Sequence, residues 1–369
     1  MQTDGLASSD TELMRSILQR IATGPELSKN ISREEAHQAM RLILDERVDP
    51  VQAGVFLIAL RMKRETDDEM LGLLDALREA TPAVTASVDE LIDLGDPYDG
   101  FARTLPIAAF LPALLAACGV PAVSHGVESM GPKYGVTHRQ VLRAAGLPIG
   151  LSVEDAAARL ADPALGWAYI DQSAFCPKLY RLARLRSLIV KRPALTTVEV
   201  LLGPIRARRR THLVTGFVHK AYPRVYALLA RAARFDSALL VRGVEGGVIP
   251  SIRQEGKYFR YDRGEVEQEH RMTPADFGLT APLLPVAAES GTDAKEVSEE
   301  ATVDNDAIAR ATVEAGRRAL EGQPGAAREN LVAAAALCLH HLGRHPTLGA
   351  AAAAVRVVLD SGDAARRLR

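Results

Sequence analysis

Apolar side chains recur with helical spacing over the first 80 residues of the chain. In one run they lie at Ala36, Met40 and Ile43, three to four residues apart, and a second run follows after residue 69. Each run is preceded by a Ser or Thr with a Glu three residues later, at residues 32–35 and 66–69. That is the spacing of a capping box, in which hydroxyl and carboxylate satisfy free N–H groups at a helix start. The pattern predicts a small all-α region.

From residue 91 the pattern changes to short β-prone runs that end at glycine and alternate with Ala/Leu-rich helices. We expect strands at residues 91–94, 121–124, 213–218, 238–242 and 257–261, and helices at residues 111–118, 222–234, 330–342 and 347–359. Strands that alternate with helices form a mostly parallel sheet covered by helices. The predicted fold class is therefore α/β, a small all-α N-terminal domain plus a large α/β domain whose central sheet is flanked by helices.

An uncharged run at residues 105–123 has the length of a membrane span, but three prolines interrupt it. We therefore expect a buried helix that leads into a buried strand, and no contact with a membrane. Residues 281–306 are acidic and rich in Ala, Ser and Thr, and this composition predicts a surface linker or a mobile edge.

Composition narrows the class of protein. With 47% hydrophobic and 25% charged residues, the 369-residue chain is neither disordered nor collagen-like. Its three cysteines are far apart and form no paired motif, so neither a disulfide framework nor a zinc ribbon is predicted, and a reducing cytoplasmic compartment fits best. We interpret His340, His341 and His345 as surface residues rather than metal ligands.

The net charge of −1 conceals a strong segregation of charge. Residues 178–234 hold 14 Lys or Arg and one acid, Glu199, whereas the rest of the chain holds 31 basic and 45 acidic residues. One interpretation is a set of solvated helix faces whose cationic stems cover apolar surface. The alternatives are a site for a polyanion such as nucleic acid, or a face that binds an acidic protein partner.

Loops that follow strands are where open α/β sheets place their chemistry. Here these loops lie at residues 95–100, 124–129 and 243–247. Residues 116–126, Lys133-Tyr-Gly and residues 141–146 resemble the core of anthranilate phosphoribosyltransferase and its relatives, and the likeness continues at residues 59–63, 201–205 and 330–335.

The resemblance implies a flexible tail over residues 1–11 and a helical dimerisation domain made of residues 12–80 with 172–192. It implies that residues 81–171 with 193–369 form the α/β domain and that the protein is a homodimer. In such enzymes a GTGGD-type loop, a hydroxyl of an NIST-like motif and an Asp-Glu pair hold phosphoribosyl pyrophosphate and Mg²⁺, while the anthranilate amine attacks the sugar carbon.

This chain departs from that pattern at most of these points. Pro97 and Tyr98 stand in the phosphate loop, Ala108 replaces the hydroxyl, and Val248 and Ile249 replace the Asp-Glu pair. An apolar pair cannot ligate Mg²⁺, which requires oxygen ligands. The degenerate substrate-loop positions are Gly95, Asp96, Tyr98, Asp99, Gly100, Arg103, His125 and Gly126.

We interpret His125 as a structural, hydrogen-bonding residue. We expect Asp96 and Asp99 to cap the loop rather than to bind a cation. After His125 and Gly126, Val127 and Glu128 replace the Asn-Arg of the family.

The Tyr98-Asp-Gly100 loop followed by Ala102-Arg103, together with residues 125–127 and 174–177, is similar to a divergent, nucleic-acid-binding YbiB-like subgroup of the family. The resemblance therefore favours a non-catalytic dimer that binds DNA or RNA through phosphates, independently of sequence, with no catalytic residue, metal or cofactor. The alternative is an enzyme that transfers phosphoribose from phosphoribosyl pyrophosphate, with Mg²⁺, to anthranilate or a related nitrogen acceptor.

The residues expected to bind nucleic acid lie on a helix over residues 178–192 and in a loop at residues 206–210 placed beside the former substrate cleft. They are Lys178, Arg181, Arg184, Arg186, Arg206, Arg208, Arg209 and Arg210. Arg186 also occupies the position of the family's substrate-carboxylate arginine. Tyr98, Phe101 and Tyr180 are candidates for stacking on exposed bases.

Overall fold

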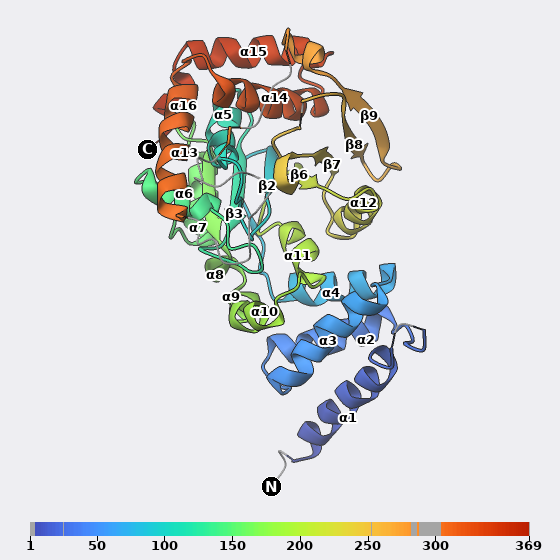
Figure 1. Cartoon of the computed structure of the whole chain (residues 1–369). Coiled ribbons are helices and arrows are strands. Elements are labelled where there is room, and N and C mark those ends of the chain that lie inside the picture. The colour runs from blue at the N-terminus through green and yellow to red at the C-terminus, as the bar shows by residue number, and fades with distance from the viewer. Residues whose placement is uncertain (1–3, 25, 252, 282–285, 288–303, 369) are drawn as a thin grey trace.

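The computed structural model of the chain describes residues 4–24, 26–251, 253–281, 286–287 and 304–368. Figure 1 shows the N-terminal helices, in blue, beneath a larger α/β part. These helices are α1 (Asp4–Ile21), α2 (Arg33–Leu44), α3 (Pro50–Lys63) and α4 (Asp67–Glu79). Both predicted capping boxes are confirmed, with Ser32 and Glu35 at the start of α2 and Thr66 and Glu69 at the start of α4. Most of the segment expected to be a tail belongs to α1.

A seven-stranded sheet with the order β4-β3-β2-β6-β7-β8-β9 forms the centre of the α/β part. Its strands are β2 (Glu90–Gly95), β3 (Ala122–Gly126), β4 (Trp167–Asp171), β6 (Arg210–Phe217), β7 (Ser237–Arg242), β8 (Gly256–Asp262) and β9 (Gln268–Met272). The first five strands in spatial order are parallel to one another. Strand β8 pairs antiparallel with β7, and β9 pairs antiparallel with β8. All five predicted strands are present, whereas β4 and β9 were not predicted. Two short strands, β1 (Val84–Thr85) and β5 (Ile205–Arg206), pair separately.

Both faces of the parallel strands are buried, which explains their continuous apolar sequences. Along β2, Leu91 belongs to one hydrophobic cluster and Ile92 to the other, and along β6 Leu213 and Val214 divide in the same way. This alternation follows from the two-residue period of a strand. One cluster joins the sheet to the N-terminal helices, and the other joins it to the C-terminal helices.

Helices cover the two faces of this sheet (Figure 1). They include α5 (Leu111–Ala117), α6 (His138–Ala144), α7 (Val153–Ala161), α11 (Leu195–Val198), α12 (Tyr222–Ala232), α13 (Asn305–Leu320), α14 (Ala326–His341), α15 (Leu348–Asp360) and α16 (Asp363–Arg366). The run at residues 105–123 is a buried helix followed by a buried strand, as predicted. No described helix is long and apolar enough to cross a membrane. The predicted linker at residues 281–306 lies mostly outside the described residues.

Residues 172–192 form three short helices, α8 (Gln172–Phe175), α9 (Pro177–Tyr180) and α10 (Ala183–Ile189), rather than one long helix. They lie against the N-terminal helices. Lys178 Nζ is 2.7 Å from Asp45 Oδ1, and Arg181 Nε is 2.6 Å from Glu46 Oε1. These ion pairs join the segment to the end of α2.

Candidate functional site

Polar side chains gather at the carboxyl ends of the parallel strands, where the loops after β2, β3 and β7 meet. Asp96, Tyr98 and Asp99 follow β2, and His125 lies at the end of β3. Each of these four residues is at most 3% exposed. The Glu245 side chain, from the loop after β7, is 4% exposed. We call this cluster the carboxyl edge. It is where open α/β sheets bind ligands.

A line of hydrogen bonds runs through the centre of the carboxyl edge. The Tyr98 hydroxyl lies 2.5 Å from His125 Nδ1, and His125 Nε2 lies 2.8 Å from Asp93 Oδ1. Because a carboxylate only accepts, His125 Nε2 is the donor in the contact with Asp93. Burial raises the pKa of Tyr98 well above its usual range, so the phenol keeps its proton. His125 is thus the hydrogen-bonding residue that the sequence suggested.

The loop after β2 is closed by its own carboxylates. Asp96 Oδ1 accepts from the Val248 N–H at 2.7 Å, and Asp96 Oδ2 lies 2.8 Å from His138 Nε2. Asp99 Oδ2 accepts from Arg192 Nε at 2.8 Å. Asp96 therefore joins the loop after β2 to the loop after β7, and both carboxylates have partners within the protein.

Glu245 makes the most contacts of these side chains. Its carboxylate accepts from the N–H groups of Ala102 at 3.2 Å and Arg103 at 3.0 Å and from the Thr104 hydroxyl at 2.9 Å, with Lys133 Nζ at 3.4 Å. Burial pushes the pKa of Glu245 upward, but Lys133 and the two N–H donors outweigh it, and the pKa is lowered. A chain carboxylate thus occupies a group of donors suited to an anion.

The backbone at this edge leaves little room between the loops. Gly100 has φ +74°, and a Cβ there would lie 2.4 Å from the Gly135 oxygen. A Cβ on Gly247 would lie 2.7 Å from the Phe101 ring. Glycine is required at position 100, whereas a side chain at position 247 would require the Phe101 ring to shift. Phe101, which was expected to stack on bases, is buried between the loops.

Val248 and Ile249 are buried apolar residues at the place of the expected metal-binding pair. Within the described part of the chain, no group of three or more His, Cys, Asp or Glu side chains could hold a metal ion. The residues at this position do not fit a Mg²⁺ site.

Two family models match the chain. A glycosyl transferase family helical bundle domain matches residues 15–81, and the α/β domain of a glycosyl transferase family matches residues 99–365. The second match alone spans more than half of the chain. The chain belongs to this glycosyl transferase family.

Relatives of this glycosyl transferase family member include anthranilate phosphoribosyltransferases. The enzyme of Moorella thermoacetica is 29% identical over 361 residues, which is 97% of each chain, and that of Nitrobacter hamburgensis is 27% identical over 359 residues. A protein of Aquifex aeolicus described as uncharacterized is 31% identical over 225 residues, 60% of this chain and 65% of the relative.

Solved structures show the same fold. The anthranilate phosphoribosyltransferase of Thermus thermophilus gives a TM-score of 0.70 at 20% identity and covers 96% of this chain and 97% of that chain. The Saccharomyces cerevisiae enzyme in complex with PRPP and Mg gives 0.75 at 15% identity and covers 96% and 95%. The protein therefore has an anthranilate phosphoribosyltransferase-like scaffold.

Arg186 of this family member is not available to a phosphate or a substrate carboxylate. Its guanidinium is 2.7 and 2.6 Å from the two carboxylate oxygens of Glu199, and both side chains are buried. Gln172 Nε2 also donates to Glu199, at 3.0 Å. The expectation that Arg186 contacts nucleic acid is wrong, because Glu199, the one acid of the basic segment, neutralises it.

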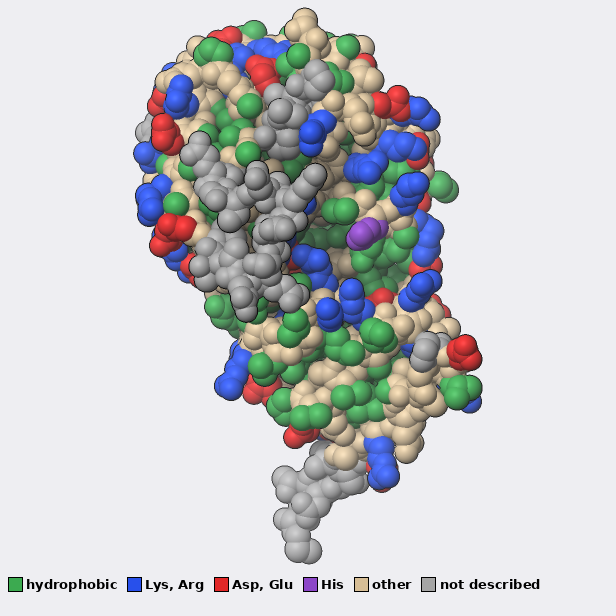
Figure 2. Space-filling view, viewed as in Figure 1, with side chains coloured by type: hydrophobic (Ala, Val, Ile, Leu, Met, Phe, Trp, Pro, Cys, Tyr) green, Lys and Arg blue, Asp and Glu red, His purple; other side chains and the backbone are tan. Residues whose placement is uncertain are grey.

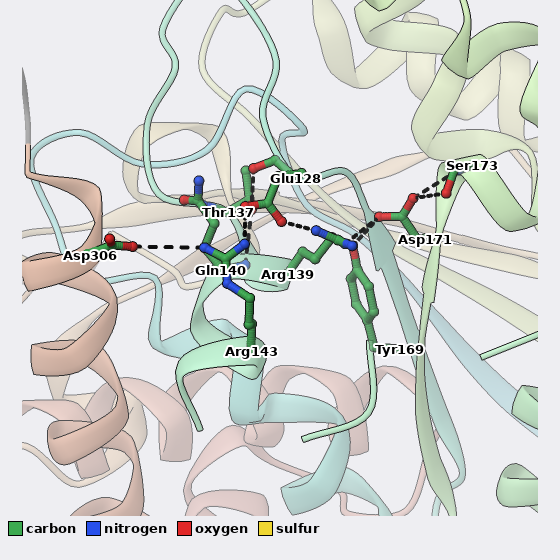
Figure 3. A network of polar contacts seen from close by, with 9 residues as sticks. All are labelled: Glu128, Thr137, Arg139, Gln140, Arg143, Tyr169, Asp171, Ser173 and Asp306. Atoms are coloured by element: carbon green, nitrogen blue, oxygen red, sulfur yellow. Dashed lines mark hydrogen bonds and ion pairs between the residues drawn. The ribbon is translucent and has the colours of Figure 1, made fainter. Parts of the chain in front are cut away.

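Glu128, another departure from the family pattern, holds α6 to the loop after β3 (Figure 3). Its carboxylate forms ion pairs with Arg139 and Arg143. Arg139 Nε is 3.0 Å from Asp171, whose carboxylate also accepts from the Ser173 N–H at 2.9 Å. The negative charge of Glu128 is therefore balanced within the protein.

Several other residues of the basic segment, residues 178–234, also have partners within the protein. Arg206 donates to the backbone oxygens of Gly203 and Ala233 and stacks on the Phe235 ring at 4.1 Å, and burial lowers its pKa. Arg206 is thus a structural residue, against expectation. Arg210 Nη2 is 2.5 Å from Asp262 Oδ1, and Lys178 and Arg181 make the ion pairs described above.

The loop at residues 206–210 was expected beside the substrate cleft, but it lies at the other end of the sheet. Arg210 begins β6 and pairs in register with Glu90, the first residue of β2. The expectation was wrong because a loop that precedes a parallel strand lies at its amino end. Arg184, Arg208 and Arg209 are exposed, and we find no ion-pair partner for them among the residues described.

Two further details differ from the sequence interpretation. Tyr98 is 2% exposed and cannot stack on a base, whereas Tyr180 is 37% exposed. His341 is not a surface residue in the expected sense, because its Nε2 lies 2.7 Å from the Ser237 hydroxyl and burial lowers its pKa to about 3. Its partner comes from β7, 104 residues away, so spacing along the chain could not reveal it.

Proposed function

We propose that the protein is a pentosyltransferase that acts at the carboxyl edge, with phosphoribosyl pyrophosphate as the donor to test first. The observation that carries the proposal is the end-to-end match with anthranilate phosphoribosyltransferases, which extends over 97% of each chain for the Moorella protein. The position of the buried polar cluster supports it, because ligands of open α/β sheets bind outside the carboxyl ends of the strands.

The proposed site for phosphoribosyl pyrophosphate differs from the pattern of the family. Lys133 and Arg192 are two cationic side chains at the carboxyl edge, and they contact Asp99 and Glu245. A diphosphate that binds here must replace these carboxylates as the partner of the two cations. The side chains of Val248 and Ile249 offer no oxygen to a metal, so we assign no catalytic step to a protein-held Mg²⁺ at that position. We expect slow turnover for these two reasons.

The proposed acceptor also differs. Since Glu199 balances the charge of Arg186 in a buried, bidentate pair, that guanidinium is not free to select an acceptor carboxylate. We therefore expect anthranilate to have no advantage over an uncharged aromatic amine such as aniline.

The test is release of pyrophosphate from phosphoribosyl pyrophosphate with a panel of nitrogen acceptors, with Mg²⁺ and with a chelator. Arg192→Ala removes one cation proposed to contact phosphoribosyl pyrophosphate. Arg310→Ala removes an exposed arginine of α13 and is the matched control. Release that Arg192→Ala lowers at least tenfold and Arg310→Ala leaves unchanged supports the proposal. Release no faster than without protein, for every acceptor, refutes it.

Nucleic-acid binding without catalysis is a second proposal, which the relatives do not address. One observation favours it: Arg184, Arg208 and Arg209 are exposed and have no ion-pair partner in the described ranges. A salt series of binding to a short single-stranded oligonucleotide tests it, because the slope counts the phosphates neutralised. Arg208→Ala with Arg209→Ala should reduce the slope by about 1.4, because each phosphate neutralised on a single strand contributes about 0.7, and an unchanged slope rejects this role.

We also propose that the chain is a homodimer through its helical part. Val51, Val55 and Met62 of α3, with Leu188 of α10 and Val190 after it, are 40 to 73% exposed. The two helices are neighbours, because a Cβ on Gly54 would lie 3.6 Å from the Leu185 side chain. Burial of this apolar face by a second copy would stabilise both. Light scattering of Val51→Asp with Met62→Asp should show monomers, and a monomeric native protein refutes the proposal.

A further inference from the structure

A charged pocket of about 470 Å³ lies at the amino ends of the parallel strands. This amino-edge pocket is roughly 16 Å, the length of β2, from the carboxyl edge. Its walls carry four arginines, Arg209, Arg210, Arg263 and Arg344, and three acids that include Glu90 and Asp236. It is therefore separate from the proposed transferase site.

Two of the three acids are engaged by the protein itself. Glu90 Oε1 is 3.1 Å from His212 Nε2, and its other oxygen pairs with Arg344. The hydrogen bond to His212 and the pairing with Arg344 lower the pKa of Glu90 to about 2. Asp236 accepts from the Thr211 N–H at 2.8 Å. Both carboxylates therefore have local partners.

The arginines divide into paired and unpaired ones. Arg210 pairs with Asp262 and Arg344 with Glu90. Arg209 and Arg263 are exposed, and neither guanidinium has a carboxylate partner in the part of the chain that the structure describes. Against them stands one exposed acid of the pocket, Asp89.

The backbone holds both unpaired arginines in place. The Arg209 backbone N–H donates to the backbone carbonyl oxygen of Asp89 at 3.2 Å, and the Arg263 backbone N–H donates to that of Asp236 at 2.7 Å. Arg263 sits in a left-handed turn with φ +46°. Only the side chains have to be ordered when a ligand binds, and this lowers the entropic cost of binding.

We propose that the amino-edge pocket binds a phosphate-bearing ligand, with Arg209 and Arg263 as its principal contacts. A guanidinium presents paired N–H donors that match phosphate oxygens. Direct contacts to two unpaired guanidinium groups favour a ligand with several negative charges, although Asp89 and Asp236 oppose it, whereas a single carboxylate gains little. The volume suits a small phosphorylated molecule or one phosphate of a nucleic-acid backbone.

Calorimetric titration of the full chain with pyrophosphate at low ionic strength tests the proposal. We compare the native protein, Arg209→Glu with Arg263→Glu, and Arg310→Glu as a control that reverses the charge of an exposed arginine on α13. We expect the double reversal to weaken binding at least tenfold, about 1.4 kcal/mol, and the control to stay within twofold. Arg209→Gln with Arg263→Gln should be intermediate, and circular dichroism verifies that each variant is folded.

A parallel titration with a short single-stranded oligonucleotide distinguishes the two sources of phosphate. Loss of pyrophosphate binding alone in the double reversal identifies a small phosphorylated ligand, and loss of oligonucleotide binding identifies a nucleic-acid backbone. Either result supports the pocket. Binding of both probes that survives the double reversal, or binding of neither probe to the native protein, overturns it. Pyrophosphate that binds at the carboxyl edge would survive the double reversal.

Discussion

Glu245 is the side chain whose removal should disturb the carboxyl edge most. Its carboxylate accepts from two N–H groups and one hydroxyl and lies near Lys133, with 4% of the side chain exposed. Glu245→Ala leaves three donors and a partly buried ammonium without this partner. An unsatisfied buried donor costs about 1–3 kcal/mol. Three such donors together would cost about 3–9 kcal/mol. Because water that enters beside Lys133 can replace part of the lost contacts, we expect the lower part of this range, a loss of about 3–5 kcal/mol in the free energy of unfolding.

Two further variants show which part of this loss is electrostatic. Glu245→Gln keeps the shape and one accepting oxygen, so we expect it to lose about half as much as Glu245→Ala. Glu314→Ala is the matched control, because Glu314 is 75% exposed and lies 4.0 Å from Arg318. Such surface changes are usually within about 0.5 kcal/mol of the native value. Urea unfolding followed by circular dichroism measures all three.

Added anions provide a second readout of the same side chain. Formate or acetate can enter the space left by Glu245→Ala and accept from the Ala102 and Arg103 N–H groups. We expect either ion to raise the melting temperature of this variant and to leave that of the native protein unchanged. A Glu245→Ala variant within 0.5 kcal/mol of native stability would show that the carboxylate does not hold the loops together.

Three other predictions follow from buried groups. Glu199→Gln should destabilise the fold by about 3–5 kcal/mol, because Arg186 would remain buried without a counter-charge, and the double change to Glu199→Gln with Arg186→Met should recover part of this in urea unfolding. Gly100→Ala should lower the melting temperature by several degrees, since both φ and the Gly135 oxygen oppose a Cβ, and an unchanged melting temperature would contradict the loop geometry. The pKa of His341 is lowered to about 3 in the folded protein, so between about pH 6.5 and 3 the unfolded chain binds more protons than the folded one. The free energy of unfolding should therefore decrease as the pH falls through this window, by up to about 1.4 kcal/mol per pH unit. His341→Gln should reduce this slope.

The elements of the fold could be predicted because their signals are local. The capping boxes at Ser32 and Thr66 and the apolar runs of β2 and β7 depend on neighbours within a few residues. Strand β4, Trp167–Asp171, was missed although Gly166 precedes it and its first four residues are apolar, so its signal was present in the sequence. Strand β9, Gln268–Met272, is polar and lies at the sheet edge, so it lacks the apolar signal.

The partners of the basic residues could not be predicted, because they come from distant segments. Phe235 lies against Arg206, and Asp45 and Glu46 pair with α9 and the residue after it. Charge counted along the chain does not reveal such pairing. The position of residues 206–210, in contrast, could have been read from the sequence, since they precede a predicted parallel strand and so lie at its amino end.

The two edges of the sheet handle charge in opposite ways, and this bears on both proposed sites. At the carboxyl edge, Asp96, Asp99 and Glu245 satisfy the N–H groups and cations that a diphosphate would need. A donor that uses these N–H groups and cations must exchange with the carboxylates, so variants that remove one of them should lower fold stability and open the edge to anions together. At the amino edge Arg209 and Arg263 have no carboxylate partner among the described residues, and a phosphate can bind without displacing any group.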